Sequence, residues 1–281
     1  MIAGYSIQTR REREAAVFGA IKKVDDAWNQ CHHEPVTPRL MRATRKNERA
    51  CMPQLLKPQS LFNAHGHATD RAVLAAIGLC LVSVLLCIAL VDRPVADYAH
   101  AYLRVYETTI YKPLTQIADP VPVYAGIVTG AYAIAALFGV RPGPRGTVAL
   151  RIALAILVAI ALKEQLKFLA GRTWPETWTS NNPSYIKDGV YGFFPMKGWF
   201  AANAGRGYHA FPSGHMTAIS VAMVSLALNW PRWKWLAPIP VALVAIGMIG
   251  ANYPWVSDLI AGTFLGTAVA LAAHRLGRPA T

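Results

Sequence analysis

The stretch AVLAAIGLCLVSVLLCIALV, Ala72–Val91, contains no charged side chain over twenty residues. An α-helix needs about 20 mainly apolar residues to cross the hydrocarbon core of a bilayer. Because lipid offers no hydrogen-bond partners, the backbone N–H and C=O groups of such a segment must bond to each other, which favours a helix over a strand. The stretch therefore predicts a transmembrane helix.

Further apolar runs follow this stretch and predict a bundle of six transmembrane helices. The five additional runs are residues 121–140, 147–170, 215–230, 235–253 and 257–274. The predicted fold class is all-α, with a six-span membrane domain over residues 71–281 and a polar, basic cytoplasmic tail over residues 1–70. An even number of spans places both termini on the same side of the membrane.

The composition agrees with a membrane protein. Of the 281 residues, 54% are hydrophobic and 15% are charged, whereas soluble proteins carry about 25% charged residues. The net charge is +13. On the side of the termini, the basic residues near predicted helix ends are Arg71, Arg141, Arg145, Arg232, Lys234, Arg275 and Arg278. The positive-inside rule then predicts cytoplasmic termini in the inner membrane, and no nucleic acid partner is expected.

The polar tail contains one amphipathic pattern and a linker with several prolines. The apolar side chains that recur at the spacing of one helical face are Val17, Ile21, Val24 and Trp28. This pattern predicts a short helix lying on the membrane, on a protein partner or on its own chain, and the sequence leaves these alternatives open. Residues 35–70 are typical of a loose linker.

The end of the third predicted span supplies cations at the outward face of the membrane. Lys163 and Lys167 are four residues apart, and so lie on one face of a helix. Arg172 follows them. For either lysine alone, a side chain reaching toward the interface is the simpler explanation. Together, three cations are suited to neutralising a phosphate, and charged groups at membrane depth usually mark a functional site.

The start of the fourth predicted span adds hydrogen-bond donors. A helix N-terminus presents free N–H groups and a positive dipole end to an anion. Ser213 adds a hydroxyl, Gly214 permits close approach of the backbone, and His215 can give a proton to a leaving oxygen. Because helix directions alternate, this start lies on the same face as the end of the third span and the turn that precedes Asp258. Taken alone, Asp258 is more simply a helix N-cap.

These residues resemble the motifs of the type 2 phosphatidic acid phosphatase and vanadium haloperoxidase superfamily, in its membrane lipid phosphatase branch. The family motifs are Lys-x6-Arg-Pro, Pro-Ser-Gly-His and Ser-Arg-x5-His-x3-Asp. Residues 212–215 match the second motif in full. The resemblance implies hydrolysis of a lipid phosphomonoester or pyrophosphate at the outer face of the membrane. It also implies a substrate such as phosphatidate, phosphatidylglycerophosphate or an isoprenoid (pyro)phosphate, without a cofactor or metal ion.

The first motif is matched in part. Lys167 and Pro175 keep its spacing, but Trp174 stands in the arginine place and Arg172 stands two residues earlier. The resemblance implies that the phosphate-binding residues are Lys167, Arg172, Ser213 and Gly214, with Lys163 as a further candidate.

The third motif departs further from the family pattern. If Asp258 is its aspartate, Pro254 stands in the histidine place, and Gly247 and Met248 stand in the serine and arginine places. In the family this histidine attacks phosphorus and the aspartate orients it. Proline has no nucleophilic nitrogen within a peptide bond, so the ordinary covalent route lacks its nucleophile.

Three interpretations of this gap stay open. The chain is a degenerate member that binds lipid phosphate or serves as an accessory subunit; or His209 replaces the nucleophile, with Arg206 replacing the lost cation; or water attacks directly. A loop histidine bonded at the interface is the simpler account of His209. The leading hypothesis is an enzyme in which His215 is the acid and Asp258 orients whatever replaces the nucleophile.

Overall fold

The computed structural model describes residues 66–178, 181–195 and 207–276, and Ala68–Thr281 form one compact unit. Its α-helices are α3 (Gly66–Leu90), α4 (Asp92–Tyr98), α5 (Lys112–Thr115), α6 (Pro120–Leu137), α7 (Pro144–Ala170), α8 (Tyr185–Asp188), α10 (Gly214–Asn229), α11 (Pro238–Gly250) and α12 (Val256–Leu276). The described ranges contain isolated β-bridges but no strand, so the all-α fold class is confirmed. The amphipathic pattern of the tail and Arg206 lie outside the described residues.

Several helices are suited to crossing a bilayer. Among the described residues, four stretches have sufficient length and apolar character: Arg71–Leu90, Asp92–Leu137, Pro144–Ala170 and Val256–Leu276. Helices α10 and α11 are apolar but shorter, with 16 and 13 residues. The structure thus agrees with a helical membrane protein, while the count of six spans stays a prediction.

The connection expected between the first two spans is itself helical. From Asp92 to Leu137, α-helical segments alternate with the π-helices η3 (Ala99–Leu103) and η5 (Glu107–Tyr111) and the 3-10 helices η4 (Arg104–Tyr106) and η6 (Gln116–Ala118). Pro94 and Pro113 lie in the first turns of α4 and α5. In a first turn the backbone N–H has no partner within the helix, so proline is tolerated there. Hydropathy did not predict a helix in residues 92–120, because polar residues interrupt the apolar runs there.

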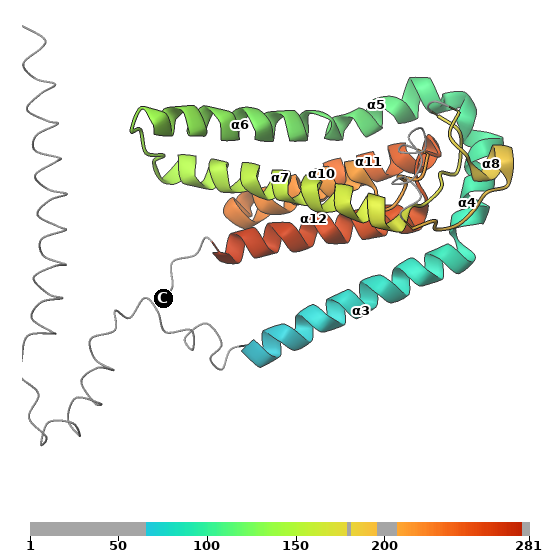
Figure 1. Cartoon of the computed structure of the whole chain (residues 1–281), viewed down its shortest axis with the longest axis horizontal. Helices are drawn as coiled ribbons and strands as arrows, with labels where there is room; N and C mark the ends of the chain where they lie inside the picture. Colours follow the sequence, from blue (N-terminus) through green and yellow to red (C-terminus); the bar gives the residue numbers. More distant parts are fainter. Residues whose placement is uncertain (1–65, 179–180, 196–206, 277–281) are drawn as a thin grey trace, which may run out of the picture. The chain divides into compact units, whose positions relative to one another are not determined.

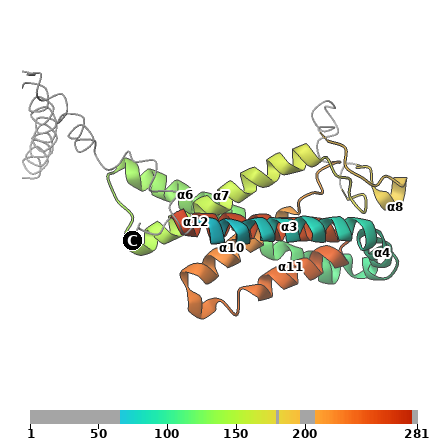
Figure 2. The same ribbon diagram turned by 90° about the horizontal axis from the view of Figure 1, so that it is seen from below.

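Helix α10 lies at the centre of the bundle and packs against α7, α11 and α12. Figure 1 shows α6, α7 and α12 running along one another, and Figure 2 shows α10 and α11 joined by a turn. The side chains that α10 buries come from several of its faces: Met216, Thr217, Ala218, Ile219, Ser220, Val221 and Ser225. A helix that buries apolar side chains all around is typical of the middle of a bundle.

Two glycines on α12 allow its close approach to α10. A Cβ at Gly262 would lie 2.5 Å from the carbonyl oxygen of Ser213, and a Cβ at Gly266 would lie 2.5 Å from that of Thr217. Small residues spaced by four let helix backbones pack closely in membrane proteins. The pair therefore fixes the start of α10 against the first half of α12.

The end of α7 is set by local sequence. Pro144 stands in the first turn of α7, and Gly171 ends the helix with a φ of 59°. This left-handed conformation carries little cost for glycine and is a common helix terminator. The chain then turns into the loop that contains α8 (Figure 1).

Candidate functional site

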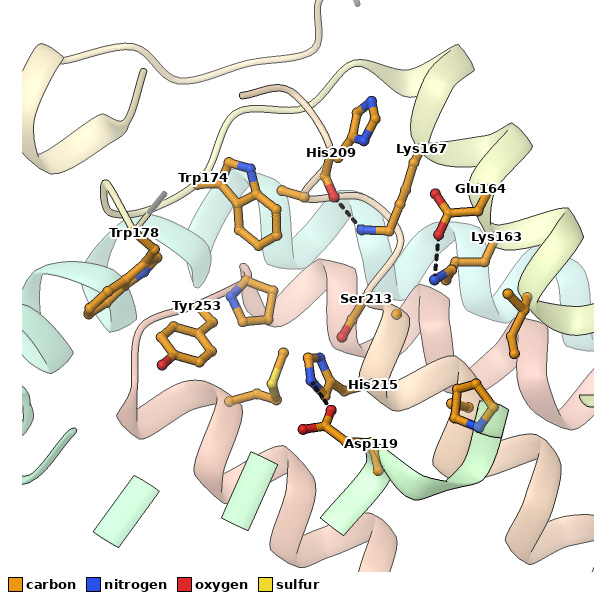
Figure 3. Close-up of a pocket in the computed structure, with 18 of the residues that line it drawn as sticks. Asp119, Lys163, Glu164, Lys167, Trp174, Trp178, His209, Ser213, His215 and Tyr253 are labelled. Carbon is orange, nitrogen blue, oxygen red and sulfur yellow. Dashed lines mark hydrogen bonds and ion pairs between the residues drawn. The ribbon is translucent and has the colours of Figure 1, made fainter. Parts of the chain in front are cut away.

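A cavity of about 890 Å³ opens where the end of α7 meets the start of α10. The junction of η6 with α6, the turn between α11 and α12, and the loop after α7 complete its walls. The site residues predicted from sequence that line it are Lys163, Lys167, His209, Ser213, Gly214 and His215. Segments far apart in the chain thus come together at one place, as the alternation of helix directions suggested (Figure 3).

The lysine of α7 that lies against the start of α10 is Lys163. A Cβ on Gly214 would lie 3.3 Å from Lys163 Nζ, so the absence of a side chain at Gly214 makes room for this contact. Lys163 Nζ also pairs with Glu164 Oε1 at 2.6 Å. An ammonium group beside the free N–H groups of a helix N-terminus is an arrangement that suits an anion.

Ser213 is the N-cap of α10 and is held by the helices around it. Its N–H donates to the carbonyl oxygen of Asp258 at 3.0 Å, which ties the start of α10 to α12. Its hydroxyl accepts from the N–H of Met216 at 3.5 Å. A serine at this position satisfies one of the helix's unpaired donors and leaves others directed outward.

The ammonium group of Lys167 contacts the loop backbone that precedes α10. Its ammonium donates to the backbone carbonyl of His209, and Nζ lies 5.5 Å from the centroid of the Trp174 ring. The imidazole of His209 points away from Ser213 and His215 (Figure 3). This orientation gives no support to His209 as a replacement nucleophile.

His215 has a carboxylate partner that sequence reasoning missed. Its Nε2 lies 3.1 Å from Oδ1 of Asp119, and both residues line the cavity. Asp119 occupies the N-cap place of α6, immediately before Pro120, but its side chain makes no capping bond. The only signal in the sequence was an acid at the start of an apolar run, which ordinarily indicates a cap.

The turn between α11 and α12 closes the cavity with Tyr253 and Pro254. The Tyr253 hydroxyl donates to Glu107 Oε1 at 2.7 Å. Burial and the Glu107 carboxylate together raise the pKa of Tyr253 above its usual value. Pro254 occupies the place where the resemblance put a nucleophilic histidine. Among the described lining residues the imidazoles belong to His209 and His215.

Arg172 does not line the cavity. Its guanidinium is 1% exposed and lies between two carboxylates, with Nη2 2.6 Å from Asp92 Oδ2 and Nη1 in contact with Asp258. Nη1 also donates to Ser257 Oγ at 2.6 Å. Burial opposes the charge, but the Asp258 and Asp92 carboxylates raise the pKa of Arg172. The donors of Arg172 are therefore directed to groups inside the protein.

Asp258 is fully buried and is likewise absent from the cavity wall. One of its carboxylate oxygens contacts Arg172, and the other accepts from the N–H of Trp255 at 3.1 Å. In this placement Arg172 and Asp258 are engaged with each other, so phosphate binding by Arg172 and orientation of a nucleophile by Asp258 stay predictions. The physical reason for their pairing is that opposite charges removed from water must pair with each other.

We call Asp92, Arg172, Ser257 and Asp258 the buried arginine cluster.

The charged residues of the cavity wall balance in formal charge. They are Lys112, Lys163, Lys167, Glu107, Asp119 and Glu164. Within the part of the chain that the structure describes, no group of three or more His, Cys, Asp or Glu side chains could hold a metal ion. Cations, a helix N-terminus and a carboxylate-bound imidazole are thus what the site offers to a ligand.

Comparison with known proteins connects this site to a family. Residues 148–281 match the model of the PAP2 superfamily. An undecaprenyl-diphosphatase from Sulfolobus acidocaldarius is 26% identical over 121 residues, which are 43% of this chain and 50% of the relative. The chain thus spans about half the length of that relative. A transmembrane PAP2 type phosphatidylglycerolphosphate phosphatase from Bacillus subtilis aligns with a TM-score of 0.37 and 16% identity, over 72% of this chain and 94% of that chain. The similarity of this chain to the PAP2 superfamily thus lies in residues 148–281.

Proposed function

We propose that this chain is a membrane phosphatase that binds a phosphorylated lipid in the cavity and releases its phosphate, with water as nucleophile and His215 as acid. The observation that carries the proposal is the meeting of Lys163, Ser213 and His215 in one cavity of about 890 Å³. A cavity of this size accommodates a lipid head group.

Binding of the phosphate relies on charge and on the start of α10. Lys163 lies against Gly214 and Lys167 enters the cavity from one turn further along α7. Their ammonium groups and the free N–H groups at the helix start would neutralise the phosphoryl oxygens as negative charge develops. The apolar lining, which includes Ile160, Pro122 and Met248, would accept the beginning of a lipid tail.

The reaction proceeds in one displacement. The oxygen of a water molecule forms a bond to phosphorus while the bond from phosphorus to the lipid oxygen breaks. His215 gives its proton to the lipid oxygen, and a proton of the attacking water then returns to the imidazole from the product phosphate. Because Pro254 replaces the family nucleophile, no phosphohistidine forms at that position, and we expect a slower enzyme than one with a covalent route.

We assign the cavity to the outer face of the cytoplasmic membrane, with both termini inside. The distribution of basic residues near the opposite helix ends supports this orientation. The name of the Sulfolobus acidocaldarius relative supports an isoprenoid diphosphate as substrate.

The test is release of inorganic phosphate by the purified full chain in detergent. The panel contains phosphatidate, phosphatidylglycerophosphate and an isoprenoid monophosphate and diphosphate. Wild-type protein is expected to release phosphate from at least one of them, and His215→Ala is expected to lower kcat by about 100-fold or more. Lys187→Met, at an exposed lysine on α8, is the control. Release that His215→Ala leaves unchanged would contradict the proposal.

A second candidate function is binding without hydrolysis, which Pro254 in the cavity wall and the engagement of Asp258 by Arg172 favour. The same cavity would then retain a phosphorylated lipid, and the tail over residues 1–70 would contact a protein partner. Thermal stabilisation by phosphatidate but not by phosphatidylcholine, together with no release from any substrate, would favour this candidate.

A further inference from the structure

The contact between His215 and Asp119 has no counterpart in the three family motifs. His215 Nε2 lies 3.1 Å from Asp119 Oδ1, within a cavity whose usual nucleophile position holds Pro254. Asp119 also precedes the segment 148–281 that matches the family model. The stretch Asp92–Leu137 therefore contributes to the site a group that the family motifs do not include.

We propose that Asp119 is a positioning residue that orients His215 for proton transfer to the lipid oxygen, an inference that rests on the proposed function. A carboxylate bound to one ring nitrogen fixes the plane of an imidazole and decides which nitrogen carries the proton in its neutral form. With Nε2–H directed to Asp119, Nδ1 is the nitrogen that exchanges a proton with the substrate.

The local structure leaves the half-exposed carboxylate of Asp119 available to His215. Asp119 stands at the N-cap place of α6, yet its side chain makes no bond to the helix. Its own N–H donates to the carbonyl of Gln116 at 3.1 Å, so the backbone around it is held in place. The common structural role of an aspartate at a helix start is thus absent here.

The other acids of the cavity wall are directed elsewhere. Glu164 pairs with Lys163 at 2.6 Å, and Glu107 accepts from the Tyr253 hydroxyl at 2.7 Å. In the buried arginine cluster Asp258 contacts Arg172. At the cavity wall, Asp119 is the acid that lies within hydrogen-bonding distance of the His215 imidazole.

The chemical consequence follows from proton balance. When water attacks phosphorus, Nδ1 of the imidazolium gives its proton to the departing lipid oxygen, while the Nε2–H bond to Asp119 persists. One proton of the attacking water then returns from the product phosphate to Nδ1. The carboxylate of Asp119 thus stabilises the charged His215 ring before proton transfer and holds the ring in the same orientation afterwards. The carboxylate itself neither gains nor loses a proton.

The experiment compares Asp119→Asn and Asp119→Glu with wild type, using the full chain in detergent and the lipid phosphate from which wild type releases most phosphate. Asp97→Asn, at an exposed aspartate of the same helical stretch, is the matched control. We expect Asp119→Asn to lower kcat by about tenfold to a hundredfold with little change in KM. Asp119→Glu, which keeps the carboxylate, is expected to recover much of the loss.

A measurement that needs no turnover accompanies the kinetics. In protein with nitrogen-15-labelled histidine, the His215 signal, identified by its loss in His215→Ala, is expected to show a proton on Nε2 in wild type and a mixture of tautomers in Asp119→Ala. A merely structural role for Asp119 would not shift this distribution.

The outcomes separate this inference from the proposed function. An active wild type with kcat unchanged in Asp119→Asn overturns the role of Asp119 and leaves the phosphatase intact. Equal loss in Asp119→Asn and Asp119→Glu with a lower melting temperature shows a structural residue and also overturns it. No release by wild type overturns the phosphatase, and the positioning role with it.

Discussion

The cavity wall and the buried arginine cluster both include residues near the end of α7 and the start of α12, but the two regions differ in physical character. Lys163 and His215 are partly exposed and have partners at the edge of an open space, Glu164 and Asp119. Arg172 is 1% exposed, and its partners are two carboxylates of similar burial. Both regions contain cations of the motif segments, yet one leaves room for a ligand while the other is filled by the protein itself.

The difference teaches that a cation stays available to a ligand when its counter-ion is exposed to solvent, and is withdrawn when its counter-ions are buried with it. Asp92 and Asp258 satisfy Arg172 within the protein, so bringing an additional anion to it would require separating a buried pair. Lys163 pairs with a half-exposed glutamate, and an incoming phosphate competes with that pair at little cost.

The largest expected effect is on stability, in the buried cluster. Arg172→Met leaves two buried carboxylates without their cation, and removing one partner of such a pair destabilises a protein by about 3–5 kcal/mol. We expect a strongly lowered melting temperature in detergent, or no folded protein. Lys163→Met is the matched control and is expected to melt near wild type. An Arg172→Met variant that melts like wild type would refute the structural role.

The second effect is on ligand binding, in the cavity. Lys163→Met removes an ammonium group beside the start of α10, and a hydrogen bond to a charged group contributes about 1.5–3 kcal/mol. We expect affinity for phosphatidate, measured by titration in detergent, to fall by roughly tenfold to a hundredfold. Lys187→Met on α8 is expected to bind like wild type. Unchanged affinity in Lys163→Met would place the phosphate elsewhere.

The third prediction concerns the connection between the two regions. Gly262→Ala adds a Cβ that would lie 2.5 Å from the Ser213 carbonyl, so α10 must shift away from α12. Inserting a methyl group into a filled contact costs about 1–3 kcal/mol. We expect a lower melting temperature together with weaker phosphatidate binding. Gly126→Ala on α6, where no atom lies within 4 Å, is the control. Loss of stability alone would show that the start of α10 tolerates the shift.

The smallest effect is expected where the family nucleophile is restored. Pro254→His places an imidazole in the cavity wall, but the oxygens of Asp258 already contact Arg172 and accept from Trp255. Without a carboxylate to orient it, the new ring should add little to phosphate release. The assay is kcat on the best substrate of the panel. A large increase would mean that Asp258 can leave the buried cluster.

Much of the fold followed from the sequence because hydrophobic length is a local property. The runs at 147–170 and 257–274 correspond to α7 and α12, and a proline and a glycine account for the ends of α7. The helical connection after Asp92 was missed because π and 3-10 turns with polar residues carry no apolar run. A hydropathy argument therefore has nothing to detect there.

The site was predictable in its location and less so in its membership. Pro212–His215 at a helix start indicated an anion site, and the cavity lies there. Motif spacing alone could not decide whether Lys163 or Arg172 faces the cavity, because Lys163 lies near the end of α7 and Arg172 lies just after it. Asp119 belongs to no motif. It lies 96 residues before His215 in the chain, so no local pattern connects the two residues.

By itself the sequence determined that the chain is a helical membrane protein with the elements of a phosphate site, because apolar length, helix starts and motif spacing are written along the chain. Only the tertiary structure decided which charges face the cavity. Pairing of buried charges depends on which segments meet, so the approach of Asp92 and Asp258 withdrew Arg172 from the site. The approach of α6 gave His215 the carboxylate of Asp119.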